Sequence, residues 1–136
     1  MASELSFADV AEGVRATIAA YAQALDDGRA DDVVATFCAD GVVEMGAMGT
    51  HAGTEALRAA YASWAPRKPQ RHLVMNTLVT EWNDHEARAV SDLVFILLGK
   101  DGWAVQLVGR YHDVFRNEGG QWKIQHRRAE FTMEST

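Results

Sequence analysis

The first part of the chain carries apolar residues at intervals of three and four positions, the spacing of one face of a helix. Ser6 precedes this stripe and Asp9 follows three residues later, as in a capping box with Asp in place of Glu. Gly28 comes after the last apolar residue and suits a left-handed helix end. The pattern predicts a first helix of about five turns, whose stripe is Phe7, Val10, Val14, Ile18, Tyr21 and Leu25.

Shorter elements are expected between this helix and position 69. Residues 30–38 are typical of a second, short helix that begins near Asp31, and residues 42–45 are typical of a short strand. The glycine-rich segment 46–53 predicts a loop with room for a brief strand. Thr54 is then expected to cap a third helix that reaches about Trp64.

The second half of the chain alternates between strand patterns and turn signals. Four strands are predicted at residues 72–82, 86–98, 103–116 and 121–132, each longer than the roughly 5–6 residues of a common strand. Helices followed by an antiparallel meander indicate a single α+β domain over residues 1–136. Because long strands twist and curl, we expect a cone-shaped α+β barrel with three amino-terminal helices on a curved sheet and a cavity between them.

His72 opens the first of these strands and is the best candidate for chemistry. On an alternating strand His72, Val74, Asn76 and Leu78 point to one side. An imidazole and a carboxamide among apolar neighbours could line a dry pocket, where histidine suits proton transfer because its pKa lies near neutrality. The alternative is a packed histidine that is only hydrogen-bonded to a neighbour.

Composition excludes several other classes of function. The formal net charge of -6 and the lack of a basic stripe argue against nucleic-acid binding. Cys38 is the one cysteine, which rules out an internal disulfide and fits a reducing, cytoplasmic setting. No apolar run approaches the roughly 20 residues of a membrane span. His51, His85 and His112 lack metal-ligand spacing, so we expect no metal site.

The ordered set of motifs resembles the SnoaL-like branch of the nuclear transport factor 2-like (NTF2-like) superfamily. The matching segments, with their spacing, run along nearly the whole chain. They are YAQALD (21–26) with Gly28, FCADGV (37–42), HAGTEA (51–56), RHLVMN (71–76), GRYHD (109–113), and GQWKI (120–124) with Arg127 and Arg128. The resemblance implies the cystatin-like cone, with a mixed, mostly antiparallel sheet.

Within that superfamily the chain resembles scytalone dehydratase, bile-acid 7α-dehydratase and hexachlorocyclohexane dehydrochlorinase, which share an Asp–His pair. The resemblance implies that Asp26 and His72 form this pair and that Tyr21 lies beside it. It also implies a basic residue late on the last strand, either Arg127 or Arg128, of which only one can face inward. Arg128 is the first choice because it shares parity with Trp122, Ile124 and His126, and a β-bulge would reverse the choice. The next strand is apolar at residues 93–97, where some of these enzymes carry a second acid–base group.

Further residues are expected to bind the substrate. For several of these positions a structural role is also open: Asp26 as a solvated helix end, Tyr21 as a packing residue, and Tyr111 and His126 in cross-strand contacts. The expected substrate-binding residues are Asn76, Met45, Tyr111, His126 and Trp64.

Two classes of function remain. The first is a cofactor-free lyase or isomerase that acts on a small hydrophobic, cyclic molecule. The second is a non-catalytic ligand-binding or assembly domain of the same fold.

The long amphipathic strands offer more apolar side chains than three helices can cover, so we expect a homodimer, with a trimer as the alternative.

Overall fold

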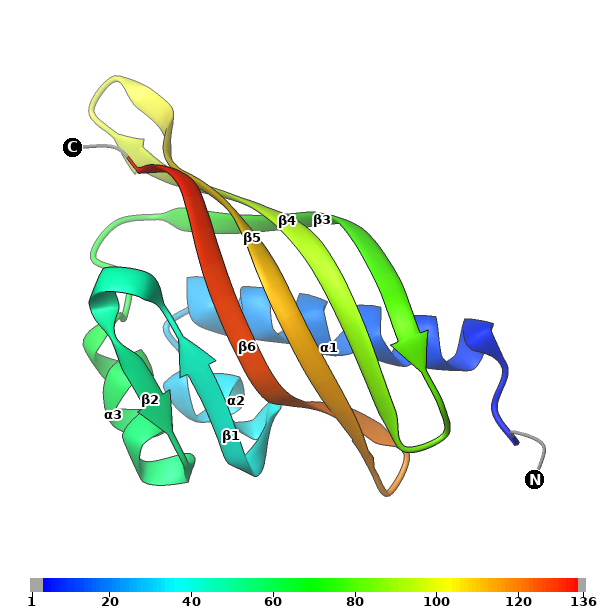
Figure 1. Cartoon of the computed structure of the whole chain (residues 1–136). Coiled ribbons are helices and arrows are strands. Elements are labelled where there is room, and N and C mark those ends of the chain that lie inside the picture. Colours follow the sequence, from blue (N-terminus) through cyan, green and yellow to red (C-terminus); the bar gives the residue numbers. More distant parts are fainter. Residues whose placement is uncertain (1–3, 135–136) are drawn as a thin grey trace.

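The computed structural model describes residues 4–134, which form three helices on a curved six-stranded sheet (Figure 1). Helix α1 spans Phe7–Asp26, α2 spans Ala30–Ala35 and α3 spans Thr54–Ser63. The expected α+β architecture is confirmed. Within the described part of the chain, no helix has the length and apolar character needed to cross a membrane.

The sheet is mixed and mostly antiparallel, in the order β2-β1-β6-β5-β4-β3. Its four carboxy-terminal strands form the predicted meander, and β1 pairs with β6 in parallel. A short 3₁₀ turn, η1 (Gly46–Met48), lies between the first two strands. The strands are β1 (Phe37–Glu44), β2 (Thr50–Ala52), β3 (Gln70–Trp82), β4 (Glu86–Gly99), β5 (Gly102–Glu118) and β6 (Gln121–Glu134).

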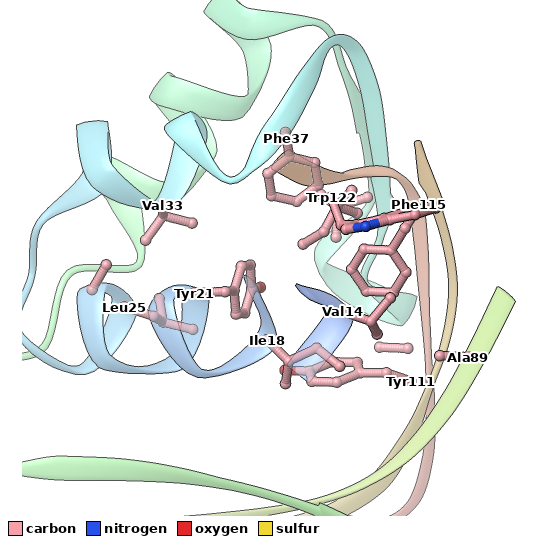
Figure 2. Close-up of a cluster of buried hydrophobic side chains, with 14 of the residues drawn as sticks. Val14, Ile18, Tyr21, Leu25, Val33, Phe37, Ala89, Tyr111, Phe115 and Trp122 are labelled. Carbon is pink, nitrogen blue, oxygen red and sulfur yellow. The ribbon is translucent and has the colours of Figure 1, made fainter. Parts of the chain in front are cut away.

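Helix α1 begins at the predicted capping box. The Ser6 hydroxyl accepts a hydrogen bond from the Asp9 backbone N–H at 3.1 Å, and the Asp9 carboxylate accepts one from the Ser6 N–H at 2.9 Å. The stripe that follows is buried against the sheet, except that Phe7 is exposed and packs on the ring of Trp82. Figure 2 shows the central part of this stripe among core side chains of the helices and strands. The cap fixes where α1 starts, and the buried stripe fixes which face meets the sheet.

Two local predictions before β2 and α3 are wrong. Helix α2 ends at Ala35, and Phe37 and Cys38 belong to β1 because β6 offers a parallel partner: Phe37 pairs with Ile124, whose N–H donates to the Thr36 carbonyl at 2.8 Å. Pairing with a distant strand thus overrides the local helix pattern. Thr54 is not the cap of α3, since Gly53 holds that position with φ 87°.

Bulges in β3 and β6 change which side chains face the helices. In β3 the register with β4 shifts between Met75 and Leu78, and Asn76 adopts a φ of 55°. His72 and Val74 therefore face inward as predicted, but the inward positions after the bulge are Thr77 and Val79. The predicted inward direction of Asn76 and Leu78 is wrong, because a bulge adds one residue and reverses the alternation.

Candidate functional site

Asp26 and His72 are in direct contact. Asp26 is the last residue of α1, and His72 is the third residue of β3. His72 Nδ1 lies 2.6 Å from Asp26 Oδ1, and the His72 backbone N–H donates to Oδ2 at 2.8 Å. The Gln70 amide donates to Oδ1 at 3.2 Å. Three hydrogen bonds therefore hold one carboxylate at the junction of helix and sheet.

The environment of this pair favours an ionised aspartate and an oriented imidazole. The side chains of Asp26 and His72 are only 5% and 14% exposed. Burial acts to raise the pKa of Asp26, but the hydrogen bonds from His72 and Gln70 outweigh it, so the pKa lies below its usual range. An ionised carboxylate accepts the Nδ1–H and leaves the Nε2 lone pair of His72 free to take a proton. The imidazole ring stacks on Phe95, with 4.4 Å between ring centroids.

His72 lines a cavity of about 270 Å³ between the helices and the sheet. Most of the other lining side chains are aliphatic, aromatic or thioether groups. Besides His72, the lining side chains with polar groups are one glutamine, three tyrosines and Trp64 with its indole N–H. The full lining is Tyr21, Leu25, Met45, Met48, Tyr61, Trp64, Gln70, His72, Leu93, Phe95, Leu107, Tyr111 and Phe131.

The tyrosine hydroxyls at the cavity wall are neutral donors. Tyr21 and Tyr61 share a hydrogen bond of 2.6 Å between their hydroxyl oxygens, and their rings meet edge-on. Burial raises the pKa of Tyr21, Tyr61 and Tyr111 above the ordinary tyrosine value. Each therefore keeps its proton near neutral pH and can donate a hydrogen bond.

A buried ion pair lies behind these tyrosines. The side chains of Arg127 and Asp113 have no exposed surface. The guanidinium donates from Nε and Nη2 to the two oxygens of Asp113, at 2.8 and 2.9 Å. Its carbon lies 3.8 Å from the ring centre of Tyr111 and 4.3 Å from that of Tyr21. Arg127 is thus the inward-facing arginine of β6.

The preference for Arg128 as the pocket arginine is wrong. Arg128 is exposed and sits over a shallow hollow on the outer face of the sheet. The register of β6 with β5 shifts between its pairs at Ile124 and His126, so that Gln125 is an extra residue and parity reverses. The core position of Ile124 therefore predicts the wrong arginine.

Two other substrate-binding candidates also lie outside the cavity. His126 is on the outer face, with its Nε2 2.6 Å from the Glu44 carboxylate. Asn76 is exposed and its amide donates to Asp92 at 2.9 Å. Both corrections follow from the bulges that shift these side chains away from the interior.

The structure brings the remaining candidates together. His72, bound to Asp26, shares the cavity with Tyr21, and the predicted substrate-binding residues Met45, Trp64 and Tyr111 also line it.

Sequence reasoning missed Tyr61, Gln70, Phe95 and the Asp113–Arg127 pair. Tyr61 could have been found, because it shares a helix face with Trp64 at a spacing of three. The ion pair gives no local signal, because its partners meet only through the pairing of β5 with β6.

Residues 4–134 offer neither a reactive cysteine nor a cluster of metal-ligand side chains. No group of three or more His, Cys, Asp or Glu side chains in this range is placed to hold a metal ion. Cys38 is buried in β1, and burial raises the pKa of its thiol to about 12. A thiol that stays protonated is a poor nucleophile.

Comparison with known proteins places this chain in a family. The model of the SnoaL-like domain matches residues 8–128. The sequence matches no curated protein.

Solved structures share the fold. A protein of unknown function from Mycobacterium tuberculosis superposes with a TM-score of 0.81 at 26% identity, over 88% of this chain and 74% of that one. A candidate scytalone dehydratase from Novosphingobium aromaticivorans superposes with a TM-score of 0.80 at 20% identity, over 91% of this chain and 85% of that one. An NTF2-like protein with a cystatin-like fold from the same organism superposes with a TM-score of 0.78 at 21% identity, over 92% of this chain and 83% of that one.

The matched region covers all three helices and most of the sheet, including the Asp26–His72 pair. The fold, with its helices on a curved mixed sheet, is that of the solved NTF2-like neighbours. The chain therefore belongs to the SnoaL-like domain family.

Proposed function

We propose that this protein is a cofactor-free lyase or isomerase that removes a proton from carbon in a small hydrophobic, cyclic molecule. One observation carries the proposal: His72, fixed by the ionised Asp26, faces a largely apolar cavity. An imidazole with one nitrogen anchored and the other free is suited to be a general base near neutral pH. The apolar lining keeps charge-stabilising water away from the reacting atoms.

In the proposed reaction His72 Nε2 takes a proton from a carbon next to a carbonyl group. The C–H electron pair moves toward the carbonyl oxygen, and Tyr21 donates a hydrogen bond to the oxyanion that develops there. Asp26 stabilises the imidazolium through the Nδ1–H. In a lyase the electron pair returns to expel a hydroxyl group, which leaves as water with the proton from His72. In an isomerase the imidazolium returns that proton to a different carbon.

The cavity supports a small ring compound as the substrate. Its volume of about 270 Å³ is just below the roughly 300–1,000 Å³ of pockets for drug-sized ligands. Aromatic side chains from both layers, such as Trp64 and Phe95, offer flat apolar walls. No unpaired cation lines the cavity among the described residues, so an uncharged molecule fits better than an acid.

A non-catalytic ligand-binding or assembly domain is the alternative function. The observation in its favour is the apolar inner face of β4, where Leu93 and Phe95 occupy positions that could have held a second acid–base group. His72 is the one imidazole among the cavity-lining residues that the structure describes. A binder would need the cavity and the tyrosine hydroxyls, but not a free Nε2 on His72.

We also propose a cytoplasmic homodimer, with a trimer as the alternative. Leu78 is 67% exposed and Trp103 is 49% exposed, which leaves large apolar groups on the sheet uncovered within one chain. A second copy on the outer sheet face would cover them. The free Cys38 fits a reducing compartment.

Substitution of His72 by alanine separates the two functions. A ligand retained on purification would be identified by native mass spectrometry, and exchange of its C–H for deuterium would be followed in D₂O. If His72 is the base, His72→Ala slows exchange by roughly a hundred- to ten-thousand-fold. His126→Ala, which removes an outer-face imidazole, is the matched control and leaves exchange unchanged. Equal exchange in wild type and His72→Ala would refute the catalytic proposal and favour the binder.

A further inference from the structure

The three tyrosines of the chain form one cluster at the cavity wall. Tyr21 comes from α1, Tyr61 from α3 and Tyr111 from β5, and the sequence contains no other tyrosine. The ring centroids of Tyr21 and Tyr61 are 5.7 Å apart, and those of Tyr21 and Tyr111 are 6.3 Å apart. Both pairs are edge-on. The cluster joins three elements that lie far apart in the sequence.

The hydroxyl groups of this cluster have a donor to spare. Tyr21 and Tyr61 each carry one O–H, and a single hydrogen bond joins their oxygens. One of them donates in this bond, so the other keeps its proton for a different acceptor. Both residues line the cavity, and a ligand oxygen is the acceptor that could take this proton.

Arg127 is placed to act on the tyrosines and not on the ligand. It is absent from the cavity lining, and the faces of the Tyr21 and Tyr111 rings cover its guanidinium. Asp113 takes two of its nitrogens, and Nη1 has no hydrogen-bond partner in the described part of the chain. The guanidinium lies between two aromatic faces and one of its buried N–H groups has no partner. Its positive charge therefore interacts mainly with those two rings.

We infer that Arg127, fixed by Asp113, is a positioning residue that makes the Tyr21–Tyr61 hydroxyl pair a subsite for a ligand oxygen that develops negative charge. The inference rests on the proposed function and adds the substrate class, an uncharged ring compound with a carbonyl or phenolic oxygen. A cation behind a phenol ring strengthens the O–H as a donor. Burial has the largest effect on the pKa of Tyr21 and raises it. The charge of Arg127 has the next largest effect and lowers this pKa, by more than the charge of Asp113 raises it.

The first test uses the small number of tyrosines. Biosynthetic replacement by 3-fluorotyrosine gives three ¹⁹F resonances, all from this cluster, which single Tyr→Phe variants assign. Addition of 4-nitrophenol, a ring compound with one phenolic oxygen, is expected to shift the Tyr21 and Tyr61 resonances most. If none of the three resonances responds to 4-nitrophenol, the subsite proposal is overturned.

The second test measures ionisation of the bound probe. The phenolate form of 4-nitrophenol is yellow, so its ionisation can be followed by absorbance during a pH titration. With the wild-type protein the midpoint is expected about one pH unit below that of the free probe. The double variant Arg127→Met/Asp113→Leu removes both charges together, which buried pairs tolerate far better than loss of one partner. It should return the midpoint to the free value, whereas Arg128→Gln on the outer face should not change it.

A third arm separates this inference from the proposed function. In His72→Gln the lowered midpoint should persist, because the phenolate lies at the tyrosines. Loss of the shift in His72→Gln alone would show that the imidazole takes the proton, which overturns the tyrosine subsite and leaves the general base intact. An unchanged shift in Arg127→Met/Asp113→Leu would overturn the role of Arg127. Near-UV circular dichroism checks that each variant keeps its tertiary packing.

Discussion

Replacement of Asp26 by asparagine tests whether this carboxylate is held by its partners or is a solvated helix end. The carboxylate accepts three hydrogen bonds, two from His72 and one from Gln70. Hydrogen bonds to a charged group each contribute roughly 1.5–3 kcal/mol. Asparagine keeps one acceptor oxygen but turns an NH₂ group toward a donor. We therefore expect Asp26→Asn to lower the free energy of unfolding by about 2 kcal/mol at pH 7.

The loss should depend on pH in a definite direction. The pKa of Asp26 is lowered in the folded state, so its contribution to stability is complete above the unfolded-state pKa of about 3.9. That contribution disappears as the pH falls through the lower, folded-state pKa. The difference between wild type and Asp26→Asn should be constant near neutral pH and should shrink in acid below about pH 4.

Urea unfolding followed by tryptophan fluorescence, at pH 7 and at steps down to pH 3, measures this difference. Asp27→Asn is the matched control, because the neighbouring carboxylate is 56% exposed and only meets Arg29 at 3.3 Å. Exposed pairs of this kind contribute about 0–1 kcal/mol, so the control should unfold almost as the wild type does. Equal losses in the two variants, or a loss in Asp26→Asn that persists unchanged into acid, would refute the reasoning.

Three further predictions concern packing, the thiol and assembly. A Cβ at Gly13 would collide with the indole of the buried Trp122, so Gly13→Ala should lower the free energy of unfolding by about 1–2 kcal/mol despite its better helix propensity. Urea unfolding measures this loss, and an unchanged free energy would contradict the prediction by showing that the indole moves away. Since burial raises the pKa of the Cys38 thiol to about 12, iodoacetamide at pH 8 should leave the native protein unlabelled but should label the protein unfolded in urea. Mass spectrometry reads the labelling, and rapid labelling of the native protein would contradict this prediction. If a second copy covers the outer face of the sheet, light scattering at micromolar concentration should give the mass of a dimer for wild type and a smaller mass for Leu78→Lys. A monomer mass for wild type would exclude the homodimer.

The elements could be predicted because each has a local signal, and the dyad because the order of the motifs resembles a known family. The capping box at Ser6 and the apolar stripe define α1 without reference to the rest of the chain. Turn residues separate the strands of the meander in the same way. The Asp26–His72 pair was implied by resemblance of motif order, since the two residues are far apart in the sequence and only the fold brings them to 2.6 Å.

Most of the wrong predictions share one physical cause, which is pairing between strands. The partner strand β6 extends β1 back to Phe37, although the preceding residues favour a helix. A bulge at Asn76 in β3 and another at Gln125 in β6 reverse the faces of the side chains that follow, up to the next register shift of each strand. A bulge depends on the register with the neighbouring strand, so alternation along one strand cannot reveal it.

The bulge in β6 has a direct consequence for the site. Without it, the alternation that buries Trp122 and Ile124 would bring Arg128 inward and leave Arg127 on the outer face. With it, Arg127 enters the core opposite Asp113, which is its direct partner on β5, and the pair meets at 2.8 Å. Because Gln125 drops out of the alternation, a cation lies behind the tyrosines while the apolar core before it is preserved. Deletion of Gln125 should remove the bulge and leave Arg127 opposite Asp113, since His126 would then follow Ile124 directly and still pair with Val114. The tyrosine cluster, read by ¹⁹F resonances, should therefore keep its response to 4-nitrophenol, and a lost response in a variant that still folds would contradict this role of the bulge.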